Sequence, residues 1–214
     1  MRFAINVPNF GEFADARAFA ELARRTEAAG WDGLFVWDHV VHHKRLRREI
    51  ADPWILLTAA ALVTSRNRLG TMITPVVRRR VSKLACEVTT VDRLSDGRMI
   101  FGAGLGAPLD DEYATFGESA DPRVLAARLD EGLAALDLLW SGEQVSFRGK
   151  HVVVDDVAFR PVPVRRPRVP VWIGGYWPNK APMRRVARSP LRPFSAADGR
   201  DRVHSCLRAD SRPG

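Results

Sequence analysis

The segment from Val81 to Gly106 constrains the possible fold more than any other part of the chain. Apolar residues recur here at steps of three and four positions: Val81, Leu84, Ala85, Val88 and Val91. This spacing predicts an amphipathic helix, which Gly97 ends. Residues 98–101 are apolar enough for a short buried strand, and the glycine-rich run at 102–106 leaves the end of that strand almost without side chains. The segment therefore predicts a helix followed by a strand whose C-terminal end has room for a flat or anionic ligand.

The same alternation of strand and helix runs through the rest of the chain. We expect strands at 2–8, 33–37, 68–74, 98–101 and 171–174, and helices at 15–30, 53–64 and 121–141 besides the one just described. Asp15 and Asp121 stand where helix N-caps are expected. A β-hairpin at 144–154 and a proline-rich link at 160–170 interrupt the rhythm. Short apolar strands that alternate with helices predict an α/β fold with a parallel sheet.

Five strand–helix units fit either a (β/α)₈ barrel or an open doubly wound sheet. Polar or glycine-rich residues follow the ends of successive strands at position 9 and at 38–39, 74–75, 104–106 and 174–175. A barrel would gather these positions into one ring around one site, whereas an open sheet would string them along an edge. The positions favour the barrel. Since a complete barrel needs about 250 residues, we expect an incomplete one with about five βα units and a hairpin insertion.

Several motifs together resemble a known family. The segment at 92–98 reads DRLSDGR, and the segments MRFAINVPNFGE, EAAGWDGLFVWDHV, ADPWILLTAAALVTSRNRLGTMITP and RPRVPVWIGGYWP occur in the family's order. The chain resembles the bacterial luciferase-like family of flavin- and deazaflavin-dependent oxidoreductases over residues 1–187. The resemblance implies a TIM-barrel fold and hydride transfer between the cofactor and a small organic substrate. It is strongest to the branch that uses coenzyme F-420, because of the run Trp37-Asp38-His39, and FMN is the alternative cofactor.

The resemblance also implies which residues form the site. His39 is the expected catalytic residue, since the family's matching histidine lies beside the reactive ring. In the family the third strand carries a bulge with a cis peptide behind that ring, and the resemblance places this peptide at Thr71-Met72. The expected cofactor-binding residues are Asp38, His39, Thr71, Met72, Thr74, Gly104, Leu105, Gly106, Gly174 and Gly175.

The residues themselves leave alternatives open. An imidazole can give or take a proton near neutral pH, but Asp38-His39 could equally hold the loop after its strand. Asn9, which follows the first strand, could form hydrogen bonds either with a substrate or with a loop. His42 and His43 extend a histidine run, yet no further ligand segment has a recognisable spacing, so we expect no metal site. The glycines at 104 and 174 could serve a planar cofactor or close packing.

Two further functional hypotheses compete with the family function. Gly102, Gly104 and Ala107 fit a loose dinucleotide fingerprint, which would make the chain a Rossmann-type NAD(P)-dependent oxidoreductase. Pro108 and the acidic run 110–112 stand where the pyrophosphate-binding helix should begin, and this argues against it. The other hypothesis is a non-catalytic truncated remnant, because the phosphate-binding loops that follow strands seven and eight of a barrel have no counterpart here.

The segment 188–214 differs in composition from everything before it. It is rich in Arg, Ser, Pro and Asp and shows neither helical nor strand periodicity. We expect a disordered or out-of-frame tail, the second through a frameshift near Arg188. If so, the fifth strand would be an edge of the sheet with unpaired backbone groups. The protein would then be prone to aggregate, or would need to form an oligomer such as a homodimer to be stable.

Charge and composition exclude some classes of protein. The formal net charge is +8, from 33 Lys and Arg against 25 Asp and Glu, but the basic residues are scattered over 44–48, 78–80, 165–166 and the tail. We therefore expect a solvated surface and no nucleic-acid binding. No run reaches the roughly 18 to 20 apolar residues of a membrane span, and two cysteines give no disulfide framework. These features predict a cytoplasmic protein.

Overall fold

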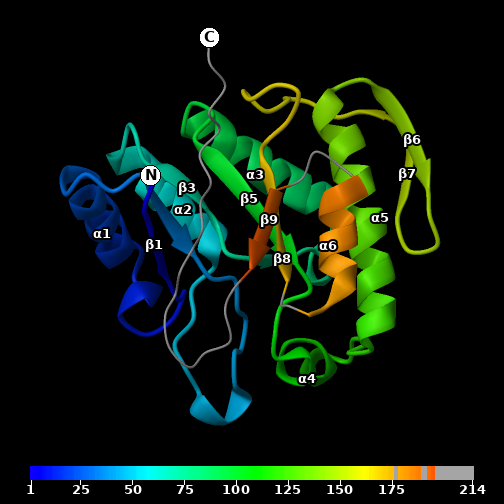
Figure 1. Ribbon diagram of the computed structural model, residues 1–214, viewed down its shortest axis with the longest axis horizontal. Helices are drawn as coiled ribbons and strands as arrows, with labels where there is room; N and C mark the ends of the chain where they lie inside the picture. Colours follow the sequence, from blue (N-terminus) through cyan, green and yellow to red (C-terminus); the bar gives the residue numbers. More distant parts are fainter. Residues whose placement is uncertain (176–177, 189–191, 196–214) are drawn as a thin grey trace.

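A parallel sheet forms the centre of the molecule (Figure 1). The computed structural model describes residues 1–175, 178–188 and 192–195. The sheet contains β1 (Ala4–Val7), β2 (Gly33–Val36), β3 (Arg68–Thr71), β4 (Thr74–Pro75), β5 (Met99–Gly104), β8 (Val171–Gly175) and β9 (Arg192–Ser195). Its order is β1-β2-β3-β5-β8-β9, with β4 paired to β5, and every pair is parallel.

This strand order distinguishes the two architectures that the sequence left open. Apart from the short β4 and a separate hairpin, each strand pairs with the next one along the chain, as in a barrel wall. A doubly wound sheet reverses its order at a switch point, and the described sheet has no such reversal. The fold is therefore an incomplete (β/α)₈ barrel, as the loop positions indicated.

Helices cover the outside of the sheet. They are α1 (Ala16–Ala28), α2 (Pro53–Val63), α3 (Val81–Leu94), α5 (Pro122–Ser141) and α6 (Lys180–Arg188), with the short α4 (Leu109–Glu112) after β5. Single 3₁₀ turns lie at Gly11–Ala14, Lys44–Leu46, Val76–Arg78 and Ala114–Phe116. The predicted hairpin forms β6 (Gln144–Arg148) and β7 (Val153–Ala158). None of the described helices is both long and apolar enough to span a bilayer.

Local sequence explains where the helices begin. The side chains of Asp15, Asp52 and Asp121 accept hydrogen bonds from backbone N–H groups in the first turns of α1, α2 and α5, which otherwise lack partners. Proline occupies the first turn of α2 and of α5, where its missing N–H costs nothing. These caps fix the start of each helix, and thereby the length of the loop that precedes it.

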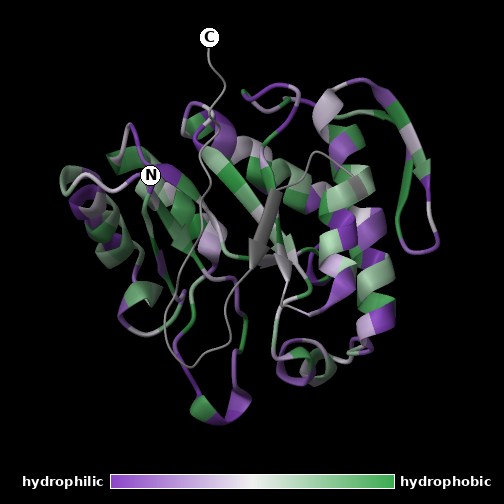
Figure 2. Cartoon of the chain, viewed as in Figure 1, coloured by the Kyte–Doolittle hydropathy of each residue, from purple (hydrophilic) through white to green (hydrophobic). Residues whose placement is uncertain are grey.

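The apolar faces of the helices pack on the sheet. Phe19 of α1, Leu84 of α3 and Trp140 of α5 are almost completely buried, as are Leu34 and Phe101 of the strands. Figure 2 shows the central strands predominantly hydrophobic and the outer helices mixed. Gly102 permits a close approach within the sheet, because a Cβ there would collide with the carbonyl oxygen of Thr71 on β3. The predicted core of the helix at 81–94 is confirmed.

Two expectations about strands are wrong. The strand expected at 68–74 is divided into β3 and β4, because the backbone turns between them with a cis peptide at Met72-Ile73, one position later than the Thr71-Met72 bond that the resemblance implied. The strand at 171–175 is also not an edge in the described part of the chain. Arg192–Ser195 pairs with it as β9, since parallel pairing uses backbone groups and needs no apolar alternation. Residues 196–214, most of the predicted tail, lie outside the described residues.

Candidate active site

The loops that follow β1, β2, β4 and β5 meet at the C-terminal edge of the sheet. In Figure 1 this edge lies at the bottom, where α4 and the loop after β2 are seen. In barrels of this type the residues after the strands form the active site. The predicted positions 9, 38–39, 74–75 and 104–106 all lie at this edge.

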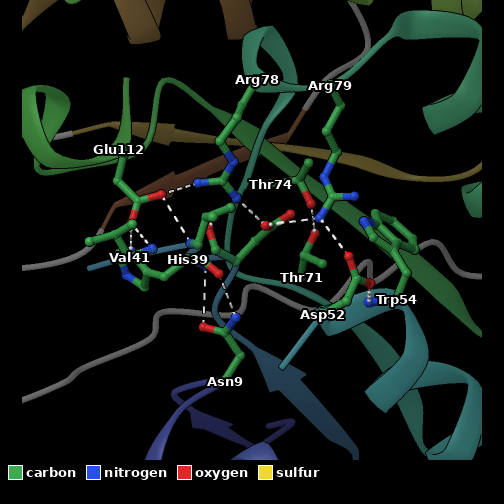
Figure 3. Close-up of polar contacts among 12 residues, drawn as sticks. Asn9, His39, Val41, Asp52, Trp54, Thr71, Thr74, Arg78, Arg79 and Glu112 are labelled. Atoms are coloured by element: carbon green, nitrogen blue, oxygen red, sulfur yellow. Dashed lines mark hydrogen bonds and ion pairs between the residues drawn. The ribbon is translucent and has the colours of Figure 1, made fainter. Parts of the chain in front are cut away.

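Asn9 clamps the loop after β2. Its Nδ2 donates to the carbonyl oxygens of His39 (2.8 Å) and Ala51 (2.7 Å), and its Oδ1 accepts from the N–H of His39 (3.2 Å). The residue is fully buried, and these bonds use its amide in both directions (Figure 3). Of the two roles that the sequence left open for Asn9, the structure shows the loop-holding one.

Glu112 is the centre of the polar network. Its Oε1 lies 3.1 Å from Nδ1 of His39, and its carboxylate accepts from the backbone N–H groups of Val40 (3.2 Å), Val41 (3.2 Å) and His42 (2.6 Å). Burial alone would raise the pKa of Glu112. The hydrogen bond with His39, the charge of Arg78 and the backbone N–H groups outweigh it and lower this pKa to about 2. Glu112 is therefore an anion at neutral pH, although its side chain is inaccessible to solvent.

Arg78 joins this carboxylate to a second one. Its guanidinium forms ion pairs with Glu112 and with Asp38, and its Nη2 also donates to the carbonyl oxygen of Asp38 (2.8 Å). Nη2 of Arg79 lies 3.1 Å from Oδ1 of Asp38, the carboxylate oxygen that Arg78 also binds, and 3.4 Å from the carboxylate of Asp52 (Figure 3). Removing a charged group from water costs free energy, and here each buried ion has a partner of opposite charge that offsets this cost.

The expectation that residues 78–80 belong to a solvated surface is therefore wrong for two of the three. The side chains of Arg78 and Arg79 are only 7% and 15% exposed. Asp38 is likewise turned inward, and its carboxylate binds these two arginines. Its predicted contact with a cofactor stays a prediction, and its observed role is to hold the η3 turn (Val76–Arg78) against the loop after β2.

An aromatic cluster surrounds His39. The ring of His42 lies 4.7 Å from that of His39 and 4.8 Å from that of Phe10, and Trp37 packs edge-on against Phe10 and His39. Burial, together with the charges of His39, His43 and Arg48, lowers the pKa of His42 to about 4. His42 is thus a neutral part of the cluster at physiological pH. Among the described residues, no group of three His, Cys, Asp or Glu side chains could hold a metal ion.

Ile73 covers the ends of β5 and β8. A Cβ at Gly104 would lie 2.8 Å from Cδ1 of Ile73, and one at Gly174 would lie 3.0 Å from its Cγ2. Close packing against Ile73 therefore explains both glycines, and Pro75 and Pro182 play the same role beside Gly106 and Gly175. Their contact with a cofactor stays a prediction, as it does for Leu105.

The threonines of the third strand hold its bend. Thr74 Oγ1 donates to Thr71 Oγ1 (3.0 Å), and Thr71 Oγ1 donates to the carbonyl oxygen of Gly102 (3.2 Å). Both threonines are fully buried, whereas Met72 and Ile73 between them are only half-buried. The part of the bulge that a ligand could touch is thus apolar.

Sequence reasoning missed Glu112, Arg78 and Arg79. Glu112 stands in an acidic run, but it follows Leu109 by three positions, and Tyr113 at the C-cap follows Leu109 by four. The short helix therefore places Glu112 on the same inward face as these two apolar residues. This spacing was a usable signal. Nothing in the sequence marks Arg78 and Arg79 as buried, because the carboxylates of Asp38 and Glu112 that bind them lie 34 to 41 positions away.

Comparisons with known proteins identify the family of this chain. The model of the luciferase-like monooxygenase family matches residues 1–188. The chain is 34% identical to a protein named F420-dependent glucose-6-phosphate dehydrogenase from Beutenbergia cavernae, over 73% of this chain and 45% of that one. It is 31% identical to the protein of the same name from Amycolatopsis mediterranei, over 69% and 46%.

A solved structure shares the fold. Monooxygenase RslO1 from Streptomyces bottropensis superposes with a TM-score of 0.77 at 29% identity, covering 90% of this chain and 59% of that one. The chain thus spans about half the length of these relatives. The family match agrees with the sequential parallel sheet, and it gives no support to the Rossmann-type alternative. The chain belongs to the luciferase-like monooxygenase family.

Proposed function

We propose that this chain holds the residues that donate and accept the proton in the active site of an oxidoreductase or monooxygenase. That enzyme uses coenzyme F-420, with FMN as the alternative, to transfer a hydride to or from a small organic molecule. The observation that carries the proposal is the pairing of a partly accessible His39 with the buried, ionised Glu112. The names of the F420-dependent relatives favour coenzyme F-420 over FMN.

The residues present fit a flat aromatic group. Trp37, Met72, Ile73 and Leu105 are half-buried at the ends of their strands, while the residues just before them in the sheet are buried. They offer an apolar surface at the C-terminal edge of the sheet, where Trp37 packs edge-on against the His39 ring, whose side chain is 15% exposed. When bound, a deazaflavin or flavin supplies or accepts the hydride. The chain's own residues then orient the ring and manage the proton.

His39 is suited to move that proton through Nε2. The Glu112 carboxylate accepts at Nδ1 and so keeps the proton on that nitrogen. Nε2 of the neutral ring is then free to accept a proton from a substrate hydroxyl, and the carboxylate stabilises the imidazolium that results. In the opposite direction the imidazolium returns the proton. Asn9 holds the backbone of His39 in place, because it binds both the N–H and the carbonyl oxygen of that residue.

The proposal is tested first by binding. Fluorescence titrations of the purified chain with coenzyme F-420 and with FMN should show saturable binding of F-420. Tight FMN binding without a response to F-420 would overturn the cofactor preference. A cooperatively folded chain that binds neither would contradict the proposal and support the non-catalytic alternative.

A matched pair of variants tests the role of His39. If the wild-type chain turns over glucose 6-phosphate or another sugar phosphate, His39→Gln should retain cofactor binding and lose about 10²-fold or more in turnover. His43→Gln changes an exposed neighbour that contacts Asp111 and should leave turnover within about twofold of wild type. Equal losses in both variants would exclude a specific role of His39.

A further inference from the structure

A second concave site lies at the opposite end of the sheet. A pocket of about 470 Å³ is lined by residues from 65–68, 96–98 and 164–166, the segments that enter β3, β5 and β8. In Figure 1 this end is at the top, where the loop before β8 is drawn in yellow. Because these segments precede their strands, the pocket is separated from His39 by the full length of the sheet.

The lining of this pocket is strongly basic. It contains five arginines and a single carboxylate: Arg66, Arg68, Arg98, Arg165, Arg166 and Asp96. The arginines are spread over a hundred positions of the sequence, so only the fold brings them together. This concentration of charge was invisible in the sequence, where the basic residues looked scattered.

The arginines at the mouth have neutral partners. Arg68 Nη1 and Arg165 Nε both donate to the carbonyl oxygen of Gly97, each at 3.0 Å. Arg66 donates to the carbonyl oxygens of Glu27 (2.8 Å) and Trp31 (3.3 Å). No carboxylate among the described residues forms an ion pair with any of these three side chains. Each guanidinium has five N–H donors, so several remain available.

The same arrangement brings like charges close together. Two guanidinium groups share the oxygen of Gly97, and a dianion placed between them would offset their repulsion. Burial and the charges of Arg165, Arg2 and Arg98 outweigh the opposing charge of Asp92 and lower the pKa of Arg68, which agrees with an excess of positive charge here. Planar guanidinium groups bind tetrahedral oxyanions through pairs of N–H donors.

We infer that the pocket between the segments 65–68, 96–98 and 164–166 binds a phosphoryl dianion, either inorganic phosphate or the phosphate of a small monoester. Arg68, Arg165 and Arg166 hold the phosphoryl oxygens. Arg98 does not take part directly, because its donors are already bound to the carbonyl oxygens of residues 61, 64, 67 and 95 and to the hydroxyl of Thr64. The negative charge of Asp96 repels the dianion and weakens its binding.

Isothermal titration of the full chain with inorganic phosphate, at constant ionic strength set with chloride, tests this inference. Saturable one-site binding is expected. Arg166→Gln and Arg165→Gln should each weaken it about tenfold, the loss expected for one charge-assisted hydrogen bond. Asp96→Asn should tighten it, and asparagine is compatible with the positive φ of 51° at this position. Ribose 5-phosphate in place of phosphate separates a monoester site from a phosphate site by which ligand binds more tightly.

Two control variants locate the binding. Arg123→Gln removes an equal charge from the exposed start of α5, and Arg48→Gln removes one at the opposite edge, where Arg48 lies over Phe10. Both should bind phosphate as the wild type does. The inference is overturned if phosphate gives no more heat than chloride, if Arg123→Gln weakens binding as much as Arg166→Gln, or if only Arg48→Gln abolishes it.

Discussion

Glu112 Oε1 and His39 Nδ1, 73 positions apart in the chain, lie 3.1 Å from each other, although the carboxylate is completely inaccessible to solvent and the imidazole is not. The carboxylate is therefore placed to control the histidine without itself meeting a ligand. Its ionisation depends on the fold, and this has a measurable consequence.

Acid should destabilise the protein through Glu112. The folded-state pKa of about 2 lies below the unfolded value of 4.5, so its stabilising contribution is complete above pH 4.5 and is lost as the pH falls towards 2. The shift corresponds to roughly 3 kcal/mol. Urea unfolding of wild type and Glu112→Gln at pH 7 and pH 3 should show a large difference at pH 7 that shrinks at pH 3. A difference that is independent of pH would contradict the ionised state of Glu112.

Protonation of His42 should also destabilise the folded protein, at a higher pH than protonation of Glu112. Its folded-state pKa of about 4 lies below the unfolded value of 6.5. The unfolded chain therefore binds the proton more tightly, and folding stability falls as the pH drops from 6.5 to 4. His42→Asn suits the positive φ of 61° at this position and should flatten this part of the stability profile. An NMR titration of the wild-type His42 ring should have its midpoint near pH 4.

Gly102→Ala should destabilise the sheet. The new methyl group would collide with the carbonyl oxygen of Thr71 on the neighbouring strand, and backbone in a sheet cannot yield as a flexible side chain does, so we expect a loss of at least about 3 kcal/mol. Gly117→Ala is the control, because its Cβ meets nothing within 4 Å and only the φ of 76° opposes it, at about 1 kcal/mol. Similar thermal shifts for both variants would show that β3 and β5 are not so tightly packed.

Arg98→Met should be among the most destabilising changes in the chain. It would leave the carbonyl oxygens of residues 61, 64, 67 and 95 without their donor, at a cost of about 3 kcal/mol or more. Arg93→Met removes a single exposed contact of 3.3 Å to the carbonyl oxygen of Val162 and should cost less than about 1 kcal/mol. Chemical denaturation of the two variants measures the contrast directly.

The parts of this fold that could be predicted from the sequence are those set by local periodicity. Helix caps such as Asp15 and Asp121 and the apolar face of the helix at 81–94 depend on residues a few positions apart. His39 could be singled out because it follows a strand. The burial of Arg78 could not be predicted in this way. Its guanidinium is buried because two carboxylates from distant segments bind it, and periodicity carries no information on such partners.

The strand at 192–195 shows a different limit. Its sequence, Arg-Pro-Phe-Ser, has no alternation and contains a proline, which is disfavoured inside sheets. Pairing with β8 follows from the position of the chain after α6, not from the residues themselves. The predicted boundary at 187–188 stays a prediction, as do a homodimer and a cytoplasmic location.

The bridge made by Arg78 also constrains when the site can form during folding. Its two carboxylates precede it by 40 positions and follow it by 34, so the loops that it ties come from three successive βα units. Local helices and hairpins close quickly, whereas contacts of this separation must wait until the intervening strands have paired. The polar centre therefore cannot form before these three units are present, and a nascent chain that has emerged only as far as α2 holds His39 and Asp38 with neither the arginine nor the glutamate that position them.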